Sequence, residues 1–167
     1  MNMRSKIVQK IKDLKEPRFC TVATVDTKGS PWSAPLFFAY DEAGRIFWTS
    51  AVDAQHSVNI KDDSRAFVSM ISEQPDINNI GNNGLYLQGT ARPANSLEEV
   101  IKIRELLCER MKITSKNPES FFGDSPRTVY IFTPEKAWCD GMKEVSAHDG
   151  GVHDCDVRVE IEFMQGE

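Results

Sequence analysis

The 167-residue sequence predicts a mainly β fold of the α+β class, in which antiparallel strands form a barrel or sandwich with peripheral helices. Two observations lead to this fold class. Short runs of β-branched and aromatic residues recur along the chain, several separated by turns that carry an Asp and a Gly, and the helical patterns fall between such hairpins. The Gly-rich fingerprints G-x-G-x-x-G and G-x-x-x-x-G-K-[ST] of doubly wound and nucleotide-binding folds do not occur.

The first helix is predicted over residues 3–15, because apolar residues at Ile7, Val8, Ile11 and Leu14 follow the spacing of one helical face. Pro17 ends this pattern. A strand follows over 19–26, where β-branched residues alternate with smaller ones, and a turn with Gly29 closes it. The chain therefore opens with a helix and enters the sheet at Phe19.

The next stretch of the chain contains the residues on which the prediction of function mainly depends. Two aromatic-rich runs, 31–40 and 45–50, flank a turn with Gly44 and predict a β-hairpin. A short helix over 53–61 follows, with Asp53 as its N-cap, and then a strand over 65–72. The hydroxyls of Thr49 and Ser50 therefore end a strand just before a helix start, where a phosphate would find free N–H groups and the positive end of a helix dipole.

The second half of the chain alternates strands and one long helix. Residues 73–84 have no hydrophobic period and predict either a mobile surface connection or a lid over a site. Gly89 within the next strand predicts a bulge or a close backbone approach. Ser96 and Glu99 form a capping box that opens a helix ending near Met111. The remaining predicted elements are a strand over 84–92, a helical turn over 118–122, and strands over 128–133, 136–139 and 156–163.

Composition narrows the class of protein. The length fits a single domain over 1–167, with an N-terminal helix over 1–16 and a barrel with inserted helices over 17–163. A net charge of −5 and a pI near 5.3 argue against nucleic acid or an anionic membrane as the partner. No apolar stretch approaches the roughly 18–20 residues that span a bilayer. The four cysteines include no C-x-x-C pair, which favours a reduced, cytoplasmic protein.

The order of these elements resembles the pyridoxamine 5′-phosphate oxidase-like family, whose members have the FMN-binding split β-barrel fold. The resemblance covers about residues 5–140 and is one of pattern. The stretches that carry it are the strand 19–26, the turn with Gly29, Pro31-Trp-Ser-Ala-Pro-Leu-Phe-Phe, Ile46-Phe-Trp-Thr-Ser50 and Gln55-His-Ser-x-Asn-Ile60. The resemblance implies a homodimer that binds two FMN molecules at the subunit interface.

The resemblance also implies cofactor-binding residues. The strand matching 33–38 would lay its backbone along the flavin ring, and the polar tail and phosphate would contact the end of the next strand and the helix start. A Gln in the strand after the long loop and a Trp in the penultimate strand region would reach the flavin. The matching residues are Ser33, Ala34, Pro35, Leu36, Phe37, Thr49, Ser50, Gln55, His56, Ser57, Gln88 and Trp138.

Two departures from the family pattern bear on function. The phosphate is usually held by Arg or Lys, whereas this chain has His56 with Gln55 beside it, and a neutral imidazole offers one donor and little charge. The Arg-rich segment that holds the substrate phosphate in pyridoxamine phosphate oxidases has no match after Trp138. We therefore expect an FMN-dependent oxidoreductase with another small-molecule substrate, and as alternatives a binding module for haem, a deazaflavin or another anionic ligand, or a redox-silent protein that uses its aromatic face to dimerise.

Several of these residues have a second interpretation. Thr49 and Ser50 are also ordinary strand-end residues, and His56 could face solvent. Trp32, Trp48 and the pair Phe37-Phe38 fit a core or a dimer interface. The set Cys139, His148, His153 and Cys155 has ligand types that suit zinc, but its loose spacing matches no standard module. We interpret it as an acidic loop and expect no metal.

Overall fold

The computed structural model describes residues 3–75, 83–114, 117–146 and 151–161. Its helices are α1 (Met3–Asp13), α2 (Gln55–Asp62), α3 (Leu97–Met111) and the 3-10 helix η2 (Pro118–Phe121). Its strands are β1 (Phe19–Val25), β2 (Pro31–Phe37), β3 (Ala39–Tyr40), β4 (Ile46–Ala51), β5 (Arg65–Ile71), β6 (Gly84–Pro93), β7 (Arg127–Ser146) and β8 (Val152–Glu160). The predicted mainly β, α+β architecture of antiparallel strands is confirmed.

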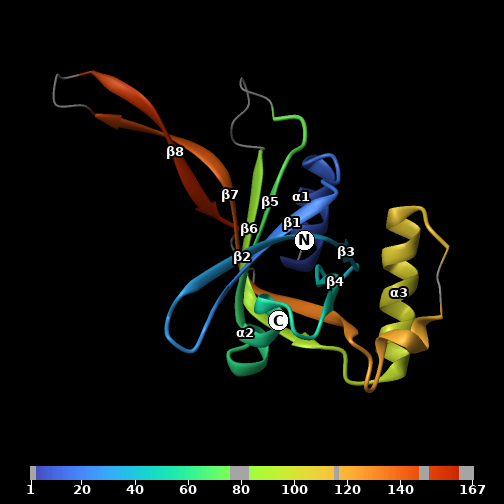
Figure 1. Ribbon diagram of the computed structural model, residues 1–167. Helices are drawn as coiled ribbons and strands as arrows, with labels where there is room; N and C mark the ends of the chain where they lie inside the picture. Colours follow the sequence, from blue (N-terminus) through green and yellow to red (C-terminus); the bar gives the residue numbers. More distant parts are fainter. Residues whose placement is uncertain (1–2, 76–82, 115–116, 147–150, 162–167) are drawn as a thin grey trace, which may run out of the picture.

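All the strands belong to one curled sheet in the order β2-β1-β5-β6-β7-β4-β3, with β8 paired to β7 (Figure 1). Every pairing is antiparallel. The strands β2 and β3 lie at opposite ends of this order although one residue, the fully buried Phe38, separates them in the chain. The sheet is therefore a barrel that is split between β2 and β3.

The predicted hairpin between 31–40 and 45–50 is only partly correct. In the structure Ala39 and Tyr40 pair with Phe47 and Ile46, whereas the earlier residues of the run pair with β1. The run divides at Phe38 because that side chain enters the core, and the strand before it then has a different neighbour from the strand after it. This division gives β2 one unpaired edge.

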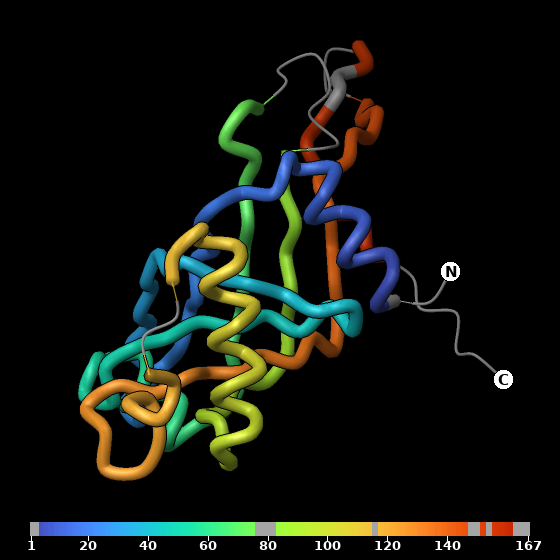
Figure 2. The backbone as a smooth tube through the Cα atoms, turned by 90° about the vertical axis from the view of Figure 1, so that its right-hand side faces the viewer, coloured from blue at the N-terminus to red at the C-terminus, as the bar shows by residue number. Residues whose placement is uncertain are grey.

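Two hydrophobic clusters lie on opposite faces of β4 and β7. Helix α1 inserts Ile7, Ile11 and Leu14 into the barrel, where they join the cluster that contains Trp48. Helix α3 covers the other face, where Leu107 packs in the second cluster. Adjacent strand residues such as Phe47 and Trp48 point to opposite faces, so one strand serves both clusters. Figure 2 shows that α1 and α3 lie apart from each other.

The pairing of β6 with β7 contains a β-bulge at Gly89, as the sequence predicts. The register shifts between Gln88 and Gly89, because Gln88 pairs with Lys136 and Gly89 with Pro134. Pro134 has no N–H to donate and is tolerated at a bulge. A Cβ at position 89 would collide with the carbonyl oxygen of Thr133. The two predicted strands on either side of Pro134 are therefore one continuous β7.

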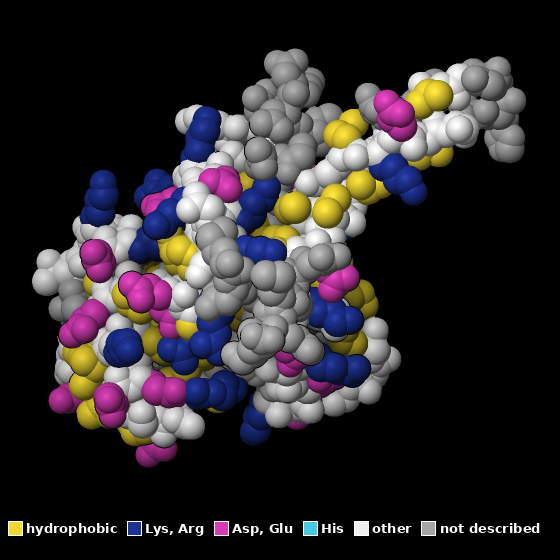
Figure 3. Space-filling model, turned by 180° about the vertical axis from the view of Figure 1, so that it is seen from behind, with side chains coloured by type: hydrophobic (Ala, Val, Ile, Leu, Met, Phe, Trp, Pro, Cys, Tyr) yellow, Lys and Arg dark blue, Asp and Glu magenta, His cyan; other side chains and the backbone are white. Residues whose placement is uncertain are grey.

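The second half of β7 and β8 form a two-stranded arm that extends from the barrel (Figure 1). The predicted strand 156–163 starts earlier, at Val152, and pairs with residues 138–146 of β7. Hydrophobic side chains such as Met142 and Val145 lie exposed along the arm (Figure 3). Residues 162–163 of the predicted strand, residues 76–82 of the predicted connection or lid, and His148 lie outside the described residues.

Helix α2 starts differently from the prediction. It begins at Gln55, its N-cap residue is Ala54, and no side chain caps it, so the assignment of Asp53 as N-cap is wrong. The capping box of α3 is confirmed in part: Ser96 Oγ accepts the backbone N–H of Glu99 at 3.2 Å, while the Glu99 carboxylate accepts the N–H of Asn95 at 3.0 Å. None of the helices among the described residues is both long enough and apolar enough to cross a membrane.

Candidate functional site

The junction between β4 and α2 is held by one buried hydrogen bond. His56 Nε2 lies 2.7 Å from Ser50 Oγ, and His56 is only 5% exposed. Burial lowers the pKa of His56 from its ordinary value of 6.5, because the charged imidazolium loses solvation there. His56 is therefore a neutral group near pH 7, and it ties the end of β4 to the first turn of α2.

The same helix is tied to β1 by a second pair of polar groups. Asn59 Nδ2 donates to Thr24 Oγ1 at 3.0 Å, and both side chains are buried. Gln55 Nε2 donates to Asn59 Oδ1 at 2.8 Å across one helical turn. Helix α2 therefore packs against β1, β2 and β6 with a face that is mostly polar and includes one core residue, Ile60.

A cavity of about 560 Å³ lies between α2 and the ends of β6 and β7. Ser57 reaches it from α2 and is only 3% exposed. Tyr130 reaches it from β7, and its ring stacks on Trp48 with centroids 5.7 Å apart. Burial raises the pKa of the Tyr130 phenol, and the nearby Ser57 hydroxyl partly offsets that rise. The residues that line this cavity, called here the α2 cavity, are Val52, Ser57, Ile60, Lys61, Ser64, Ala91, Arg92, Pro93, Thr128 and Tyr130.

The β2 residues that the resemblance assigned to the flavin ring lie on an edge strand. Ser33 and Pro35 are exposed, while Ala34, Leu36 and Phe37 are half-buried. Since β2 pairs only with β1, its other backbone edge has no strand partner among the described residues. That edge offers backbone donors and acceptors to a planar ligand.

The structure brings together some of the assigned polar residues and separates others. Ser50 and His56 are joined by a hydrogen bond, and Ser57, the next residue of α2, is also buried. Thr49 is paired with Val129 in β7, and its side chain points to the opposite face from that of Ser50, toward α3. The side chains of Thr49 and Ser50 therefore face different parts of the molecule.

Gln88 and Trp138 lie on the outward face of the sheet. Phe67 pairs with Gln88 across β5 and β6, and its ring stacks on Trp138 with centroids 6.3 Å apart. At the edge of the same face, Phe19 and Phe37 meet edge to face at 5.7 Å. We call Phe19, Phe37, Phe67, Gln88 and Trp138 the outer face. Phe67 is 37% exposed and Phe19 56%, so this face has an apolar surface open to solvent.

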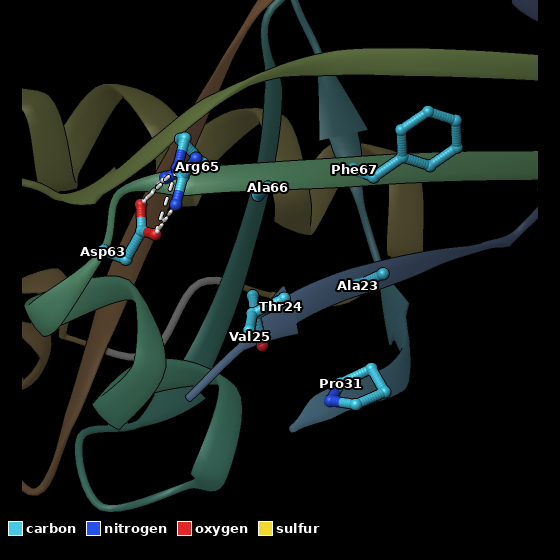
Figure 4. A pocket seen from close by; sticks show the side chains of 8 residues that line it. All are labelled: Ala23, Thr24, Val25, Pro31, Asp63, Arg65, Ala66 and Phe67. Atoms are coloured by element: carbon cyan, nitrogen blue, oxygen red, sulfur yellow. Dashed lines mark hydrogen bonds and ion pairs between the residues drawn. The ribbon is translucent and has the colours of Figure 1, made fainter. Parts of the chain in front are cut away.

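A second, smaller pocket of about 340 Å³ opens beside Phe67 (Figure 4). The side chains of Asp63 and Arg65 lie at one end of it, joined by hydrogen bonds of 2.6–3.0 Å. The Arg65 guanidinium lowers the pKa of the Asp63 carboxyl to about 2. Because the two charges neutralise each other, this pocket offers a mainly apolar surface formed by residues such as Val25 and Pro31.

The comparisons with known proteins fit this architecture. The family model for pyridoxamine 5′-phosphate oxidase matches residues 7–139. The chain belongs to this family. Among solved structures, a haem-binding protein from Mycobacterium smegmatis superposes with a TM-score of 0.64 at 16% identity over 93% of this chain and 58% of that one, so the chain spans little more than half of that protein. No curated protein matches the sequence.

Two further solved structures have a similar fold. HutZ, the haem storage protein of Vibrio cholerae, superposes with a TM-score of 0.60 at 19% identity, over 83% of this chain and 95% of that one. An F420 reductase superposes with a TM-score of 0.52 at 23% identity, over 76% of this chain and 94% of that one. At these identities the likeness establishes the fold alone.

Of the residues that line the α2 cavity, the sequence indicated only Ser57; Lys61, Thr128 and Tyr130 are among those it did not indicate. Lys61 lies one helical turn after Ser57, so the i, i+4 spacing could have placed both on one side of the helix. Thr128 and Tyr130 had no such signal, because they reach the cavity only through the pairing of β7 with β4. That pairing joins segments about 80 positions apart in the chain.

Proposed function

We propose that this protein is a cytoplasmic, homodimeric FMN-binding oxidoreductase whose small-molecule substrate differs from pyridoxamine phosphate. The observation that carries the proposal is the placement of α2 against β2 in a chain of this family. The strand that would follow the flavin ring and the helix start that would receive the polar tail thus lie on one side of the split barrel. FMN would supply hydride and electron transfer when bound.

The residues present fit such a group in two respects. The unpaired edge of β2 offers backbone hydrogen bonds to a flat ring, and half-buried Leu36 and Phe37 offer apolar contact. The hydroxyl of Ser57 is buried beside the start of α2, where it lies near the Tyr130 phenol without a hydrogen bond of good geometry, so it can donate to a ligand. His56 would position Ser50 rather than supply charge, because it is neutral and already bonded.

A second copy of the chain is the partner that the outer face fits best. Interfaces between subunits are enriched in aromatic residues at their centre. The outer face exposes Phe19 and Phe67, and half-buried Trp138 stacks on Phe67. Gln88 lies among these rings and would reach the interface with them. A dimer formed through this face would place Gln88 and Trp138 against the partner, where the family resemblance assigns them to the cofactor.

A binding module for haem or for the deazaflavin F420 is the second candidate, and the likeness to a haem-binding protein and an F420 reductase favours it. Haem iron needs an axial side chain, most often His. Of the three histidines, His148 lies outside the described residues and the side chain of His153 is not described. Nε2 of His56 is occupied by Ser50, which supports a flavin rather than haem at this site.

One spectrum distinguishes these candidates. Purified protein is incubated with FMN, F420 or haem, desalted, and its visible absorption is recorded. The proposal expects retention of FMN with its two oxidised-flavin bands, followed by bleaching under anaerobic nicotinamide-driven reduction. If the protein retains haem, seen as a Soret band, or retains only F420, then that ligand and not FMN is the one that it binds. Protein that retains none of the three contradicts the proposed function.

A further inference from the structure

The α2 cavity has an unusual balance of charge for this chain. Its ten lining residues include two cations, Lys61 and Arg92, four hydroxyl groups and no carboxylate, although the whole chain carries a net charge of −5. The other cavity of similar size mixes signs, because Lys12 and Lys102 lie there with Asp41 and Glu42. Since Glu99 pairs with Arg92, the positive charge that the lining of the α2 cavity offers is that of Lys61.

One of the two cations is available to a ligand. Arg92 forms a bidentate ion pair with Glu99, with nitrogen–oxygen distances of 2.6 and 3.0 Å. Lys61 is exposed at the mouth of the cavity and forms no ion pair within the described part of the chain. An ammonium on a flexible stem suits a compact anion at such a mouth.

The inner wall of the cavity lacks one hydrogen bond. Ser57 Oγ is fully buried; it lies close enough to the Tyr130 phenol to lower the pKa of that group, but the two do not complete a hydrogen bond of good geometry. A buried hydroxyl without a partner is unfavourable, so native proteins rarely keep one unless a ligand or water uses it. Ser57 and Lys61 lie on the same side of α2, and Thr128 adds a second hydroxyl from β7.

From these observations we propose that the α2 cavity binds a phosphate monoester, whose charge is met by Lys61 and whose oxygens accept hydrogen bonds from Ser57 and Thr128. A phosphate offers several acceptor oxygens to donors that converge from two elements. The apolar remainder of the lining, Val52, Ile60, Ala91 and Pro93, would contact the organic body of the ester.

The phosphate could belong to FMN itself or to a separate phosphorylated substrate. The proposal goes beyond the proposed function because it assigns the charge to Lys61, which the family pattern does not mark, instead of to the helix start at Gln55 and His56. It also stands if the protein binds no flavin, since the cavity, the buried hydroxyl and the lysine do not depend on one.

The test uses phenyl phosphate as the probe and phenol as its uncharged control, with binding followed by isothermal titration calorimetry. We expect saturable binding of phenyl phosphate and none of phenol. Lys61→Gln should weaken binding by about tenfold or more, because it removes a charge-assisted hydrogen bond. Lys61→Arg should restore most of it, and Lys28→Gln, which changes an exposed lysine of the β1–β2 turn, should leave it unchanged.

Ser57→Ala gives a second signature that a merely structural role would not produce. Removal of an unpartnered buried hydroxyl should leave the melting temperature of the unliganded protein the same or raise it, while phenyl phosphate binding weakens. A lower melting temperature together with unchanged binding would contradict the assignment of Ser57.

Competition identifies the source of the phosphate. If FMN displaces phenyl phosphate, and Lys61→Gln weakens FMN but not riboflavin, the site holds the cofactor's phosphate. If FMN and phenyl phosphate bind together, the site holds a separate phosphorylated ligand. If FMN binds and Lys61→Gln changes neither FMN nor phenyl phosphate affinity, this inference fails while the proposed function stands. Absence of phenyl phosphate binding in a protein that retains no FMN overturns both.

Discussion

At the scale of single residues, burial changes the chemistry that a residue type suggests. A histidine at a helix start suggests an anion ligand, yet His56 is enclosed and bonded to Ser50, and the loss of solvation keeps it neutral. Ser57, the next residue, is the one whose hydroxyl is left without a partner. Ser57, rather than His56, is therefore the residue of this helical turn that is suited to bind an anion.

The neutral His56 gives the fold a pH dependence. Its pKa is lowered in the folded state, so at pH values below 6.5 the unfolded chain binds a proton that the folded chain does not. Its contribution to stability is complete above pH 6.5 and is lost as the pH falls from there toward the lowered folded-state pKa, with a slope of at most about 1.4 kcal/mol per pH unit.

Urea unfolding at several pH values between neutral and mildly acid checks this expectation. The free energy of unfolding of His56→Gln, which cannot titrate but can still bond Ser50, should fall less steeply with decreasing pH than that of the wild type. Equal slopes for the two proteins would show that His56 is not held neutral by burial.

At the scale of elements, the two longer inserted helices start by different means. Helix α3 has a side-chain cap, since Ser96 accepts the N–H of Glu99. Helix α2 has none and is fixed instead by the inward bonds of His56 and Asn59. A capping motif in the sequence therefore identifies α3 correctly, while the start of α2 depends on groups in β4 and β1.

Two alanine variants test whether α3 has a side-chain cap and α2 has none. Ser96→Ala should lower the free energy of unfolding by about 1 kcal/mol, because it removes the cap of α3. Asp53→Ala should change it by less than about 0.5 kcal/mol, as for an exposed residue without a capping bond. Chemical denaturation of both variants measures the free energy of unfolding. A larger loss for Asp53→Ala than for Ser96→Ala would show that Asp53 does cap α2.

The β-bulge at Gly89 brings the backbones of β6 and β7 unusually close together. Gly89→Ala would place a Cβ against the backbone of β7, which cannot move without breaking the pairing of β6 and β7. We expect a loss of about 1–3 kcal/mol or more in the free energy of unfolding. Gly123→Ala is the control: its positive φ costs some strain, but no atom lies within 4 Å of the added methyl. Equal losses of stability for the two variants in thermal unfolding would argue against a close approach of the β7 backbone to Gly89.

At the scale of the whole molecule, the exposed outer face and the split of the barrel leave the sheet open to a partner. If the outer face joins two copies, Phe67→Asp should shift the protein from dimer to monomer, because it buries a charge at the centre of the interface. Phe122→Asp is a matched control, since Phe122 is 38% exposed and Phe67 37%, and it follows η2.

Sedimentation velocity of the wild type and both variants decides the matter. The expected pattern is a dimer for the wild type and Phe122→Asp and a monomer for Phe67→Asp. A wild-type monomer, or a Phe67→Asp dimer, would exclude the outer face as the contact between copies.

The sequence alone determined the fold class, most elements and the family. Periodicity identifies α1 and α3, and turn residues such as Gly29 and Gly44, both at positive φ, separate strands. Gly89 indicates the bulge because only a residue without a side chain tolerates that approach. These signals are local, so neighbouring residues are enough to read them.

Only the tertiary structure decided how the site is assembled. The division of the chain at Phe38, the bond of Asn59 to Thr24 and the meeting of Ser57 with Thr128 and Tyr130 all depend on contacts between distant segments. Strand order and solvent exclusion set these contacts, and neither is encoded in the spacing of residues along one strand or helix. The same reason explains why a lysine without a motif, Lys61, becomes the strongest candidate for an anion ligand.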